Sequence, residues 1–202
     1  MLDKSVPHIN IIMHRKAGAP FPEISVPEGF RAVLYTAGAE RDWAAIETSV
    51  LEFGKESDAL AYFQKEFLSY PGETERRCLF LETENGEKVA TASMWWKYSG
   101  KRRDPWLHWV AVKPAYQGRG LGKAVVSAAM SLLLEIEGDR NCYLHTQTWS
   151  HRAVGVYEQM GFAVTDEQNL SNYGNESFNE AVRLLTEIRG KAPVLEITRC
   201  AE

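Results

Sequence analysis

The sequence predicts a single α+β domain, in which helices flank a mixed and mostly antiparallel sheet. Its 202 residues suit about one domain of typical size. Strand-like runs and amphipathic helical segments follow one another without an internal repeat or a clear boundary. Asn85-Gly86 lies between two strand-like runs and indicates an antiparallel hairpin, because these residues accept the positive φ values of tight hairpin turns.

The expected elements follow from periodicity and turn residues. Residues 1–29 are expected to form an N-terminal strand and a proline-rich extension, and residues 30–202 the domain itself. Strands are expected at residues 9–13, 30–35, 79–81, 89–96, 106–112, 142–148, 162–165 and 194–198. Helices are expected at residues 42–53, 58–68, 121–136, 151–160 and 178–188.

Some boundaries carry their own signals. Pro71-Gly72 is expected to end the second helix, and Gly138 the long helix that begins at Leu121. Ser177 and Glu180 have the spacing of a capping box at the start of the last helix. Residues 101–103 are expected to form a basic loop.

Composition and charge exclude several classes of protein. With 23 basic and 27 acidic residues the net charge is −4, which disfavours nucleic acid as a partner. No apolar stretch approaches the ~18 residues of a membrane span, and the first residues lack the pattern of a secretory signal. The three cysteines Cys78, Cys142 and Cys200 suit neither a disulfide framework nor a metal knuckle. We therefore expect a cytoplasmic protein that binds neither a membrane nor a metal ion.

The basic residues are unevenly distributed along the chain. Residues 97–123 are strongly basic, whereas the segments before and after them are acidic. This basic island is expected to favour an anionic ligand over the acidic background. Its members are Lys97, Lys101, Arg102, Arg103, Lys113, Arg119 and Lys123.

The most informative segment is residues 110–122, a strand that turns through a glycine-rich loop directly into the strongest helix. Such a loop leaves backbone N–H groups unpaired, and the helix dipole adds partial positive charge, which favours a phosphate group. The alternative is that the glycines only make a tight turn. A Walker A loop is excluded by Gln117 and Ala124, and a dinucleotide fingerprint fails at Lys123.

The remaining pattern is Gln-x-x-Gly-x-Gly at Gln117, Gly120 and Gly122, followed by Tyr-x-x-x-Gly-Phe from Tyr157 to Phe162. In this order the two elements resemble the GNAT superfamily of acetyl-CoA-dependent N-acetyltransferases. The resemblance implies a GNAT-like domain whose sheet splays at the central strands. It also implies acetyl transfer from acetyl-CoA, without a metal, to the primary amine of a small molecule or peptide. A monomer or homodimer is expected.

The resemblance also implies how coenzyme A is held. The loop amides should cradle the pyrophosphate, with added charge from Arg119 and Lys123. The pantetheine arm should pair with the strand edge at Val110, Ala111 and Val112, and the N–H of Val110 should stabilise the oxyanion of the tetrahedral intermediate. The loop residues so implied are Gln117, Gly118, Arg119, Gly120, Leu121, Gly122 and Lys123.

Three side chains carry further hypotheses. Tyr157 is the candidate acid for the leaving thiolate, the alternative being a buried core tyrosine. His108 lies two residues before Val110, on the same strand face, and could accept the amine proton directly or through water. Its alternative is a cleft histidine with satisfied hydrogen bonds. Ser150 could contact the coenzyme, although a role as helix N-cap is favoured.

The acceptor is the least determined part. The strand around His108 is similar to that of the arylalkylamine acetyltransferases, but Trp106 stands where that group has a second histidine, so an aromatic amine does not follow. The aromatic residues near this strand could line an acceptor pocket or belong to the sheet core, and core is favoured for most. They are Trp95, Trp96, Tyr98, Trp106 and Trp109.

A rival function is a GNAT-like domain that binds an acyl-CoA without turnover, as a sensor or interaction module. The presence of both His108 and Tyr157 beside an intact loop favours the enzyme.

Overall fold

The computed structural model describes residues 2–168, 170–171 and 173–198. The fold is mixed α/β, as the sequence predicts, and its strands follow the order β2-β3-β4-β5-β6-β1-β7-β8. The strands are β1 (Asn10–Arg15), β2 (Phe30–Leu34), β3 (Cys78–Thr83), β4 (Lys88–Ser99), β5 (Arg102–Val112), β6 (Cys142–Gln147), β7 (Ala163–Thr165) and β8 (Leu195–Glu196). The helices are α1 (Glu40–Ser49), α2 (Glu56–Glu66), α3 (Pro71–Arg77), α4 (Leu121–Glu137), α5 (His151–Gln159) and α6 (Phe178–Arg189).

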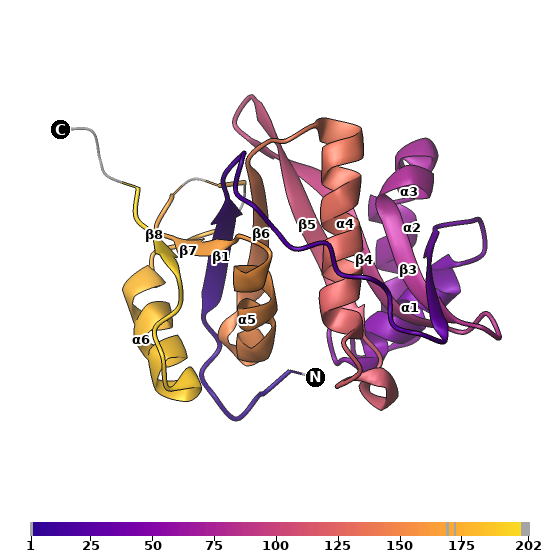
Figure 1. Cartoon of the computed structure of the whole chain (residues 1–202), viewed down its shortest axis with the longest axis horizontal. Coiled ribbons are helices and arrows are strands. Elements are labelled where there is room, and N and C mark those ends of the chain that lie inside the picture. Colours follow the sequence, from indigo (N-terminus) through magenta and orange to yellow (C-terminus); the bar gives the residue numbers. More distant parts are fainter. Residues whose placement is uncertain (1, 169, 172, 199–202) are drawn as a thin grey trace. The chain divides into compact units, whose positions relative to one another are not determined.

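These elements group into two compact units (Figure 1). The first unit contains residues 23–95 and 108–132, and the second contains residues 2–22, 96–107 and 133 onward. Strands β4 and β5 and helix α4 contribute residues to both units.

In the first unit, β2, β3 and β4 are antiparallel neighbours. The hairpin between β3 and β4 is confirmed, but only Gly86 has a positive φ, at 82°; Asn85 does not. The amide of Gly86 donates to the carbonyl of Thr83, and the amide of Thr83 donates to that of Glu87. The connection therefore needs one left-handed residue, which glycine supplies, where a two-residue type I′ turn would need two.

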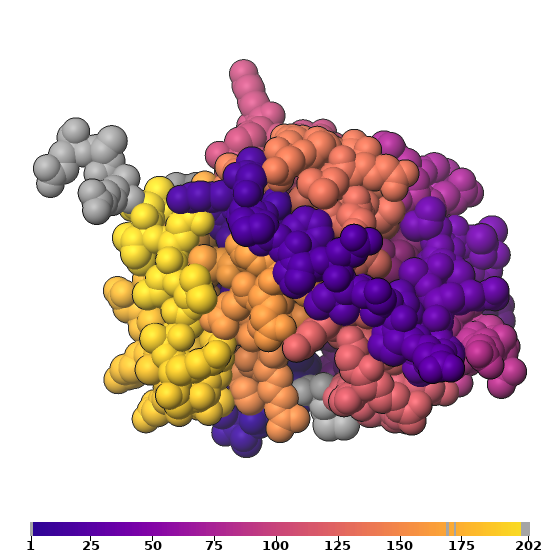
Figure 2. Space-filling model, in the orientation of Figure 1, coloured from indigo at the N-terminus to yellow at the C-terminus, as the bar shows by residue number. Residues whose placement is uncertain are grey.

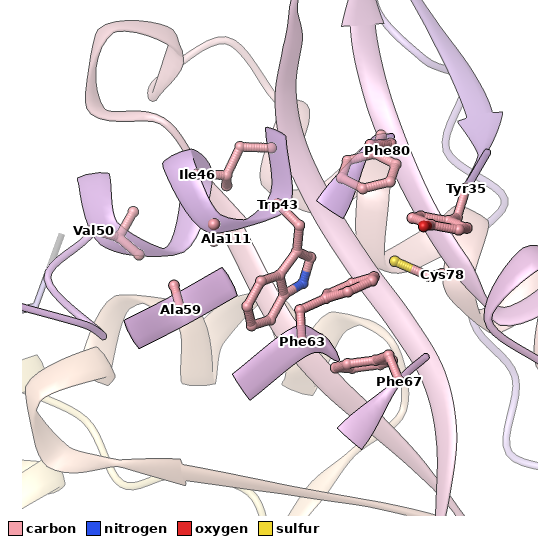
Figure 3. Close-up of a cluster of buried hydrophobic side chains, with 12 residues drawn as sticks. Tyr35, Trp43, Ile46, Val50, Ala59, Phe63, Phe67, Cys78, Phe80 and Ala111 are labelled. Atoms are coloured by element: carbon pink, nitrogen blue, oxygen red, sulfur yellow. The ribbon is translucent and has the colours of Figure 1, made fainter. Parts of the chain in front are cut away.

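Helices α1 and α2 pack against one face of this sheet through an aromatic cluster (Figure 3). Trp43 of α1 lies at its centre, fully buried, with the ring of Phe63 5.1 Å away and that of Phe67 5.8 Å away. Cys78 and Ala111 contribute the sheet side of the cluster. Because side chains alternate along a strand, Val112 faces the opposite side, where it meets the first turn of α4 at Gly122.

Helix α3 was not expected. Pro71 does not merely end the preceding helix: it stands at the first helical position of α3, where its missing N–H costs nothing. Arg77 at the end of α3 is buried, pairs with Glu73 and donates to the carbonyl of Met94. These contacts explain why so short a helix is held against the sheet.

In the second unit, the N-terminal strand is an inner strand of the sheet. Strand β1 lies between β6 and β7 and is antiparallel to both (Figure 1). Its register pairs Ile12 with His145 and Met13 with both Leu144 and Val164. Ile12 and Met13 are completely buried. The first strand is therefore part of the core of this unit, and β8 pairs with β7 at the sheet edge.

The basic loop expected at residues 101–103 is wrong for two of its three residues. Arg102 and Arg103 belong to β5, where Arg102 pairs with Asp104 and Arg103 donates two 3.0 Å hydrogen bonds to Glu137. Ion pairing lets charged side chains occupy a strand in place of a loop.

The starts of α5 and α6 lack the side-chain caps that their serines suggest, whereas glycines follow the ends of α4 and α6. Ser150 and Ser177 occupy the N-cap positions of α5 and α6, yet neither side chain makes a capping hydrogen bond. The capping box expected from Ser177 is therefore wrong in its mechanism. Gly138 and Gly190 have left-handed φ values of 74° and 66°, consistent with glycine as the residue that ends a helix. No helix within the described ranges combines the length and apolarity that crossing a bilayer requires.

The end of α1 carries an unusual carboxyl group. Glu47 is 1% exposed, and its Oε1 has no hydrogen-bond partner within the described part of the chain. Burial, and secondarily the charge of Glu52, raises the pKa of Glu47 well above its ordinary value of 4.5. Burial likewise raises the pKa of the neighbouring Cys78 thiol, to about 12. Cys78 and Cys142 are buried and form no disulfide with each other, whereas Cys200 lies outside the described residues.

Glu47→Gln should stabilise the protein increasingly as pH rises above 4.5, the ordinary pKa of this carboxyl. Above that pH the unfolded chain releases a proton that the folded chain retains, so the wild type loses stability as pH increases. Glutamine has no such proton to lose. Urea unfolding of the wild type and Glu47→Gln at pH 5, 6, 7 and 8 measures the difference between their free energies of unfolding. Glu56→Gln, at an exposed position of α2, is the control. If the free energy of unfolding changes with pH equally in the wild type and in Glu47→Gln, the prediction is wrong.

Candidate active site

The site begins at a distortion in β5. Trp109 has a φ of 50°, in the left-handed region that a residue with a large side chain rarely adopts. Such a conformation costs about 1–2 kcal/mol relative to a normal strand residue. His108, Trp109 and Val110 are all half-buried, whereas Ala111 is buried. The strand is therefore locally irregular at the residue directly before Val110.

The glycine-rich loop follows β5 through a single 3₁₀ turn, Pro114–Tyr116. The Gln117 side chain donates a 2.9 Å hydrogen bond back to the carbonyl of Val112 and fixes the loop to the end of the strand. Gly118 and Gly120 have φ values of 79° and 82°, which any other residue would adopt only with strain. The glutamine and these two glycines of the motif thus have conformational and hydrogen-bonding roles.

The approach to the loop is anchored by one carboxylate. Glu87 accepts a 2.9 Å hydrogen bond from Lys113 and a 2.6 Å hydrogen bond from the hydroxyl of Tyr116. The Tyr116 hydrogen bond, followed by that of Lys113, lowers the pKa of Glu87, and the same bond raises the pKa of Tyr116. The charge of Lys113 is therefore already paired. Arg119 lies over the Tyr116 ring, with its guanidinium carbon 5.3 Å from the ring centroid.

The loop fits an anionic group. Within the described chain, the amides of Gly118, Arg119 and Gly120 make no hydrogen bond, and neither Arg119 nor Lys123 forms an ion pair. The carbonyl of Gly120 accepts from Lys123 and Ala124, so α4 begins directly at the loop and its amino end adds partial positive charge. No atom lies within 4 Å of a Cβ built at Gly118, which leaves space over the backbone.

A segment of the extension packs beside the same loop. The amide of Ile24 donates a 2.9 Å hydrogen bond to the Ser127 hydroxyl on α4, and Pro27 lies 3.8 Å from a Cβ built at Gly120. Residues 23–27 thus cross the surface of α4 (Figure 2). This part of the extension helps to fix the loop and the first turns of the helix.

Tyr157 lies in the second unit, on α5, with 7% of its surface exposed. Its carbonyl accepts hydrogen bonds from the amides of Met160 and Phe162, and its ring meets that of Phe162 at 6.3 Å. Gly161 has a φ of 82°, and a Cβ there would lie 3.0 Å from the carbonyl oxygen of Pro20. The Tyr-x-x-x-Gly-Phe element is therefore a helix end that no residue larger than glycine can close without a shift.

Ser150 and two histidines, His145 and His151, also lie in the second unit. Ser150 ends a 3₁₀ turn and begins α5. His145 stacks on Tyr173 at 4.0 Å, and burial lowers its pKa to about 4. His151 lies 3.3 Å from a carboxylate oxygen of Asp3.

The expected site residues therefore fall into two groups. His108, Val110, Ala111, Val112 and residues 117–123 belong to the first unit, where strand end and loop adjoin. Tyr157 and Ser150 belong to the second. The basic island is divided in the same way, since Arg102 and Arg103 are paired within the second unit and only Lys113, Arg119 and Lys123 share the unit of the loop.

The aromatic residues also separate by environment. Trp106 is completely buried, as the core interpretation predicts, whereas Tyr98 is exposed and Trp96 lies under the guanidinium of Arg103, 4.8 Å from its carbon. Trp95 and Trp109 are half-buried beside the aromatic cluster. The distortion at Trp109 was missed, because no sequence signal marks a left-handed tryptophan inside a strand.

Several proteins of known classification resemble this chain. Mycothiol acetyltransferase of Streptomyces coelicolor is 27% identical over 154 residues, which are 76% of this chain and 48% of the relative. Mycothiol acetyltransferase of Beutenbergia cavernae is 29% identical over 137 residues, 67% of this chain and 45% of the relative. The chain therefore spans about half the length of these curated relatives.

Solved structures share the fold. A GCN5-related N-acetyltransferase from Sphaerobacter thermophilus aligns with a TM-score of 0.60 and 23% identity, over 77% of this chain and 48% of the other. Glucosamine-6-phosphate N-acetyltransferase from Arabidopsis thaliana aligns with a TM-score of 0.53 and 19% identity, over 72% of this chain and 99% of the other. The model of the acetyltransferase (GNAT) family matches residues 41–162, more than half of the chain and all of the loop, the distorted strand and the Tyr157 element. The chain belongs to the GNAT family of acetyltransferases.

Proposed function

We propose that this chain transfers the acetyl group of acetyl-CoA to the primary amine of a small molecule or peptide. The observation that carries the proposal is the loop of residues 117–122 at the amino end of α4. Gly118 and Gly120 are left-handed, and the amides of Gly118, Arg119 and Gly120 make no hydrogen bond within the described chain, whereas that of Gln117 donates to Pro114. Such a loop binds a diphosphate through backbone donors, and coenzyme A carries one. Arg119 and Lys123 add positive charge beside these donors.

The strand before the loop supplies the next group. The distorted backbone at Trp109 leads into Val110, whose N–H we assign to the carbonyl oxygen of the thioester. As the amine attacks, negative charge grows on that oxygen, and a fixed backbone donor stabilises it without reorganisation. Val110 and Ala111 keep ordinary apolar side chains because the backbone does this work.

Proton transfers through two side chains complete the reaction. His108 accepts a proton from the ammonium group, directly or through water, because only a neutral amine is a nucleophile. The new C–N bond then forms, the C–S bond breaks, and Tyr157 donates its proton to the departing thiolate of coenzyme A. The nitrogen of the new amide releases its second proton, which restores the Tyr157 hydroxyl, and His108 passes its proton to solvent. The products are an N-acetylated amine and free coenzyme A.

Support for this assignment comes from several sides. The relatives bear the names of acetyltransferases, and the family match spans His108, the loop and Tyr157. The Ser150 hydroxyl makes no capping hydrogen bond to α5, and we assign it a contact to the coenzyme. A cytoplasmic location and a monomeric or homodimeric state belong to the same proposal.

Acetyl-CoA should raise the melting temperature, with ATP and NAD much less effective, because a ligand that binds only the folded state stabilises it. Gly120→Ala should weaken acetyl-CoA up to about tenfold, since the left-handed φ of 82° penalises a side chain. Gly86→Ala is the matched control, with the same φ in the β3–β4 hairpin. It should lower stability while keeping the acetyl-CoA shift. Equal shifts with all three nucleotides would refute the cofactor assignment.

Tyr157→Phe should lower kcat by about 10²-fold or more, the usual contribution of a positioned acid, and leave the Kd of acetyl-CoA nearly unchanged. Tyr35→Phe is the control, because it also removes a hydroxyl from a buried tyrosine, one that donates to Glu40. Steady-state release of coenzyme A measures the rates. Wild-type kcat in Tyr157→Phe would remove this residue from catalysis, and binding without any turnover in the wild type would favour the sensor function.

His108→Ala should reduce the rate most near neutral pH, where the amine is still protonated. The deficit should shrink as pH rises, because the amine then loses its proton to solvent without a base. A pH–rate profile from 6 to 10 measures it, with His151→Ala as the control for removal of a half-buried imidazole. Parallel profiles for wild type and His108→Ala would leave His108 a structural role only.

A further inference from the structure

Three half-buried rings of the first unit form a separate wall at the surface of the aromatic cluster: Phe53, Tyr62 and Trp109. The ring centroids of Phe53 and Trp109 are 5.4 Å apart, those of Tyr62 and Trp109 5.0 Å, and those of Phe53 and Tyr62 5.6 Å. All three rest on the completely buried Trp43. We call these three rings the aromatic wall.

Strained backbone occurs in the wall itself and two residues before Phe53 in the sequence. Trp109 itself is left-handed, and so is Leu51, with a φ of 72°. Leu51 follows α1 in a Schellman arrangement: its amide donates to Thr48 and the amide of Glu52 donates to Glu47. Glycine normally occupies this left-handed position, yet here it is a leucine that is 49% exposed. Residues held in such conformations concentrate at binding and catalytic sites.

Helix α1, which supplies Trp43 beneath the wall, contains buried polar atoms that have no hydrogen-bond partner among the described residues. Within the described residues, Trp43 Nε1, Glu47 Oε1 and Thr48 Oγ1 are buried atoms without a hydrogen-bond partner, and all three belong to α1. Native proteins leave few such atoms unpaired, so each one calls for an explanation, of which a role in binding is one. Burial raises the pKa of the Tyr62 hydroxyl, a hydrogen bond with Trp109 lowers it, and the charge of Glu66, itself paired with Lys65 at 3.2 Å, raises it.

The position of the wall connects it to the proposed reaction. Trp109 directly precedes Val110, the residue assigned to the thioester oxygen. A molecule stacked on the wall therefore lies beside the residue that holds the reacting carbonyl. From these observations we infer that the wall binds the acyl acceptor, a primary amine attached to an aromatic ring, whose flat apolar part stacks on Phe53 and Trp109.

The chemistry of the wall favours this acceptor over the alternatives. Stacked and edge-to-face rings recognise another ring, and their negative faces attract an ammonium group. A sugar amine would present hydroxyl groups to a surface with few donors and acceptors. The inference rests on the proposed function, because it names the substrate class of that reaction.

The test compares acceptors in the full chain. With saturating acetyl-CoA, 2-phenylethylamine should be acetylated with a kcat/KM at least about tenfold above that of butylamine or glucosamine. Phe53→Leu should raise the KM for 2-phenylethylamine about three- to tenfold, the value of one ring contact, with kcat and the KM for acetyl-CoA changed less than about twofold. Phe53→Tyr keeps the ring and should retain the wild-type KM.

Tyr70→Leu is the matched control: it removes an aromatic side chain of the first unit that is 53% exposed and outside the wall. It should leave every acceptor constant unchanged. Thermal unfolding of each variant separates loss of the fold from loss of the acceptor, and Tyr62→Leu provides a second wall variant if Phe53→Leu unfolds.

Calorimetric titration of 2-phenylethylamine, without turnover, separates this inference from the proposed function. Binding that Phe53→Leu weakens supports the wall even if no acetyl transfer occurs, in which case only the proposed function fails. Acetyl transfer with no preference for 2-phenylethylamine overturns the wall and retains the function. A homodimer that Phe53→Leu dissociates, with acceptor constants unchanged, overturns it as well, because a second copy would then cover the rings.

Discussion

Unpaired backbone N–H groups between β5 and α4 are the constraint on which the rest of the structure depends. Every amide that leaves a sheet or helix must find another partner, and those of Gly118, Arg119 and Gly120 find none within the described chain. Two left-handed glycines keep them at the surface, and the Gln117 side chain holds the loop to the end of β5. Residues 23–27 and the hydrogen bond at Ser127 fix the adjoining helix. The fold arranges these donors in advance, in a geometry that suits an anionic ligand.

Ring contacts in the aromatic cluster of the first unit offset the energetic cost of the distortion at Trp109. A left-handed non-glycine residue costs about 1–2 kcal/mol, whereas each aromatic contact contributes about 0.5–1.5 kcal/mol beyond its burial. Trp109 makes three such contacts, with Trp43, Phe53 and Tyr62. Ring packing therefore outweighs the strain, and one side chain serves both to stabilise helices α1 and α2 on the sheet and to fix the backbone before Val110.

The sequence predicted those elements whose structure depends on interactions between residues close together in the chain. The β3–β4 hairpin, the long helix α4 and the loop were predictable because glycines and helical periodicity act over a few residues. The inner position of β1 was not, since pairing with β6 and β7 is a contact between distant segments. Helix α3 depends on the buried Arg77, and the left-handed Trp109 on its ring neighbours. Ser150 shows the converse: its residue type predicts a cap whose hydrogen bond the fold does not make.

The distribution of charge shows whether side chains or backbone groups do more to favour an anion at the loop. Three residues of the basic island predicted from the sequence form ion pairs within the protein: Arg102 with Asp104 and Glu167, Arg103 with Glu137, and Lys113 with Glu87. Arg119 and Lys123 lie beside the loop and form no ion pair within the described part of the chain. Surface charges of this kind are screened by salt over about 8–10 Å, whereas backbone donors and a helix terminus act at contact distance. Backbone geometry is therefore the main feature of the loop that favours an anionic group in a chain of net negative charge.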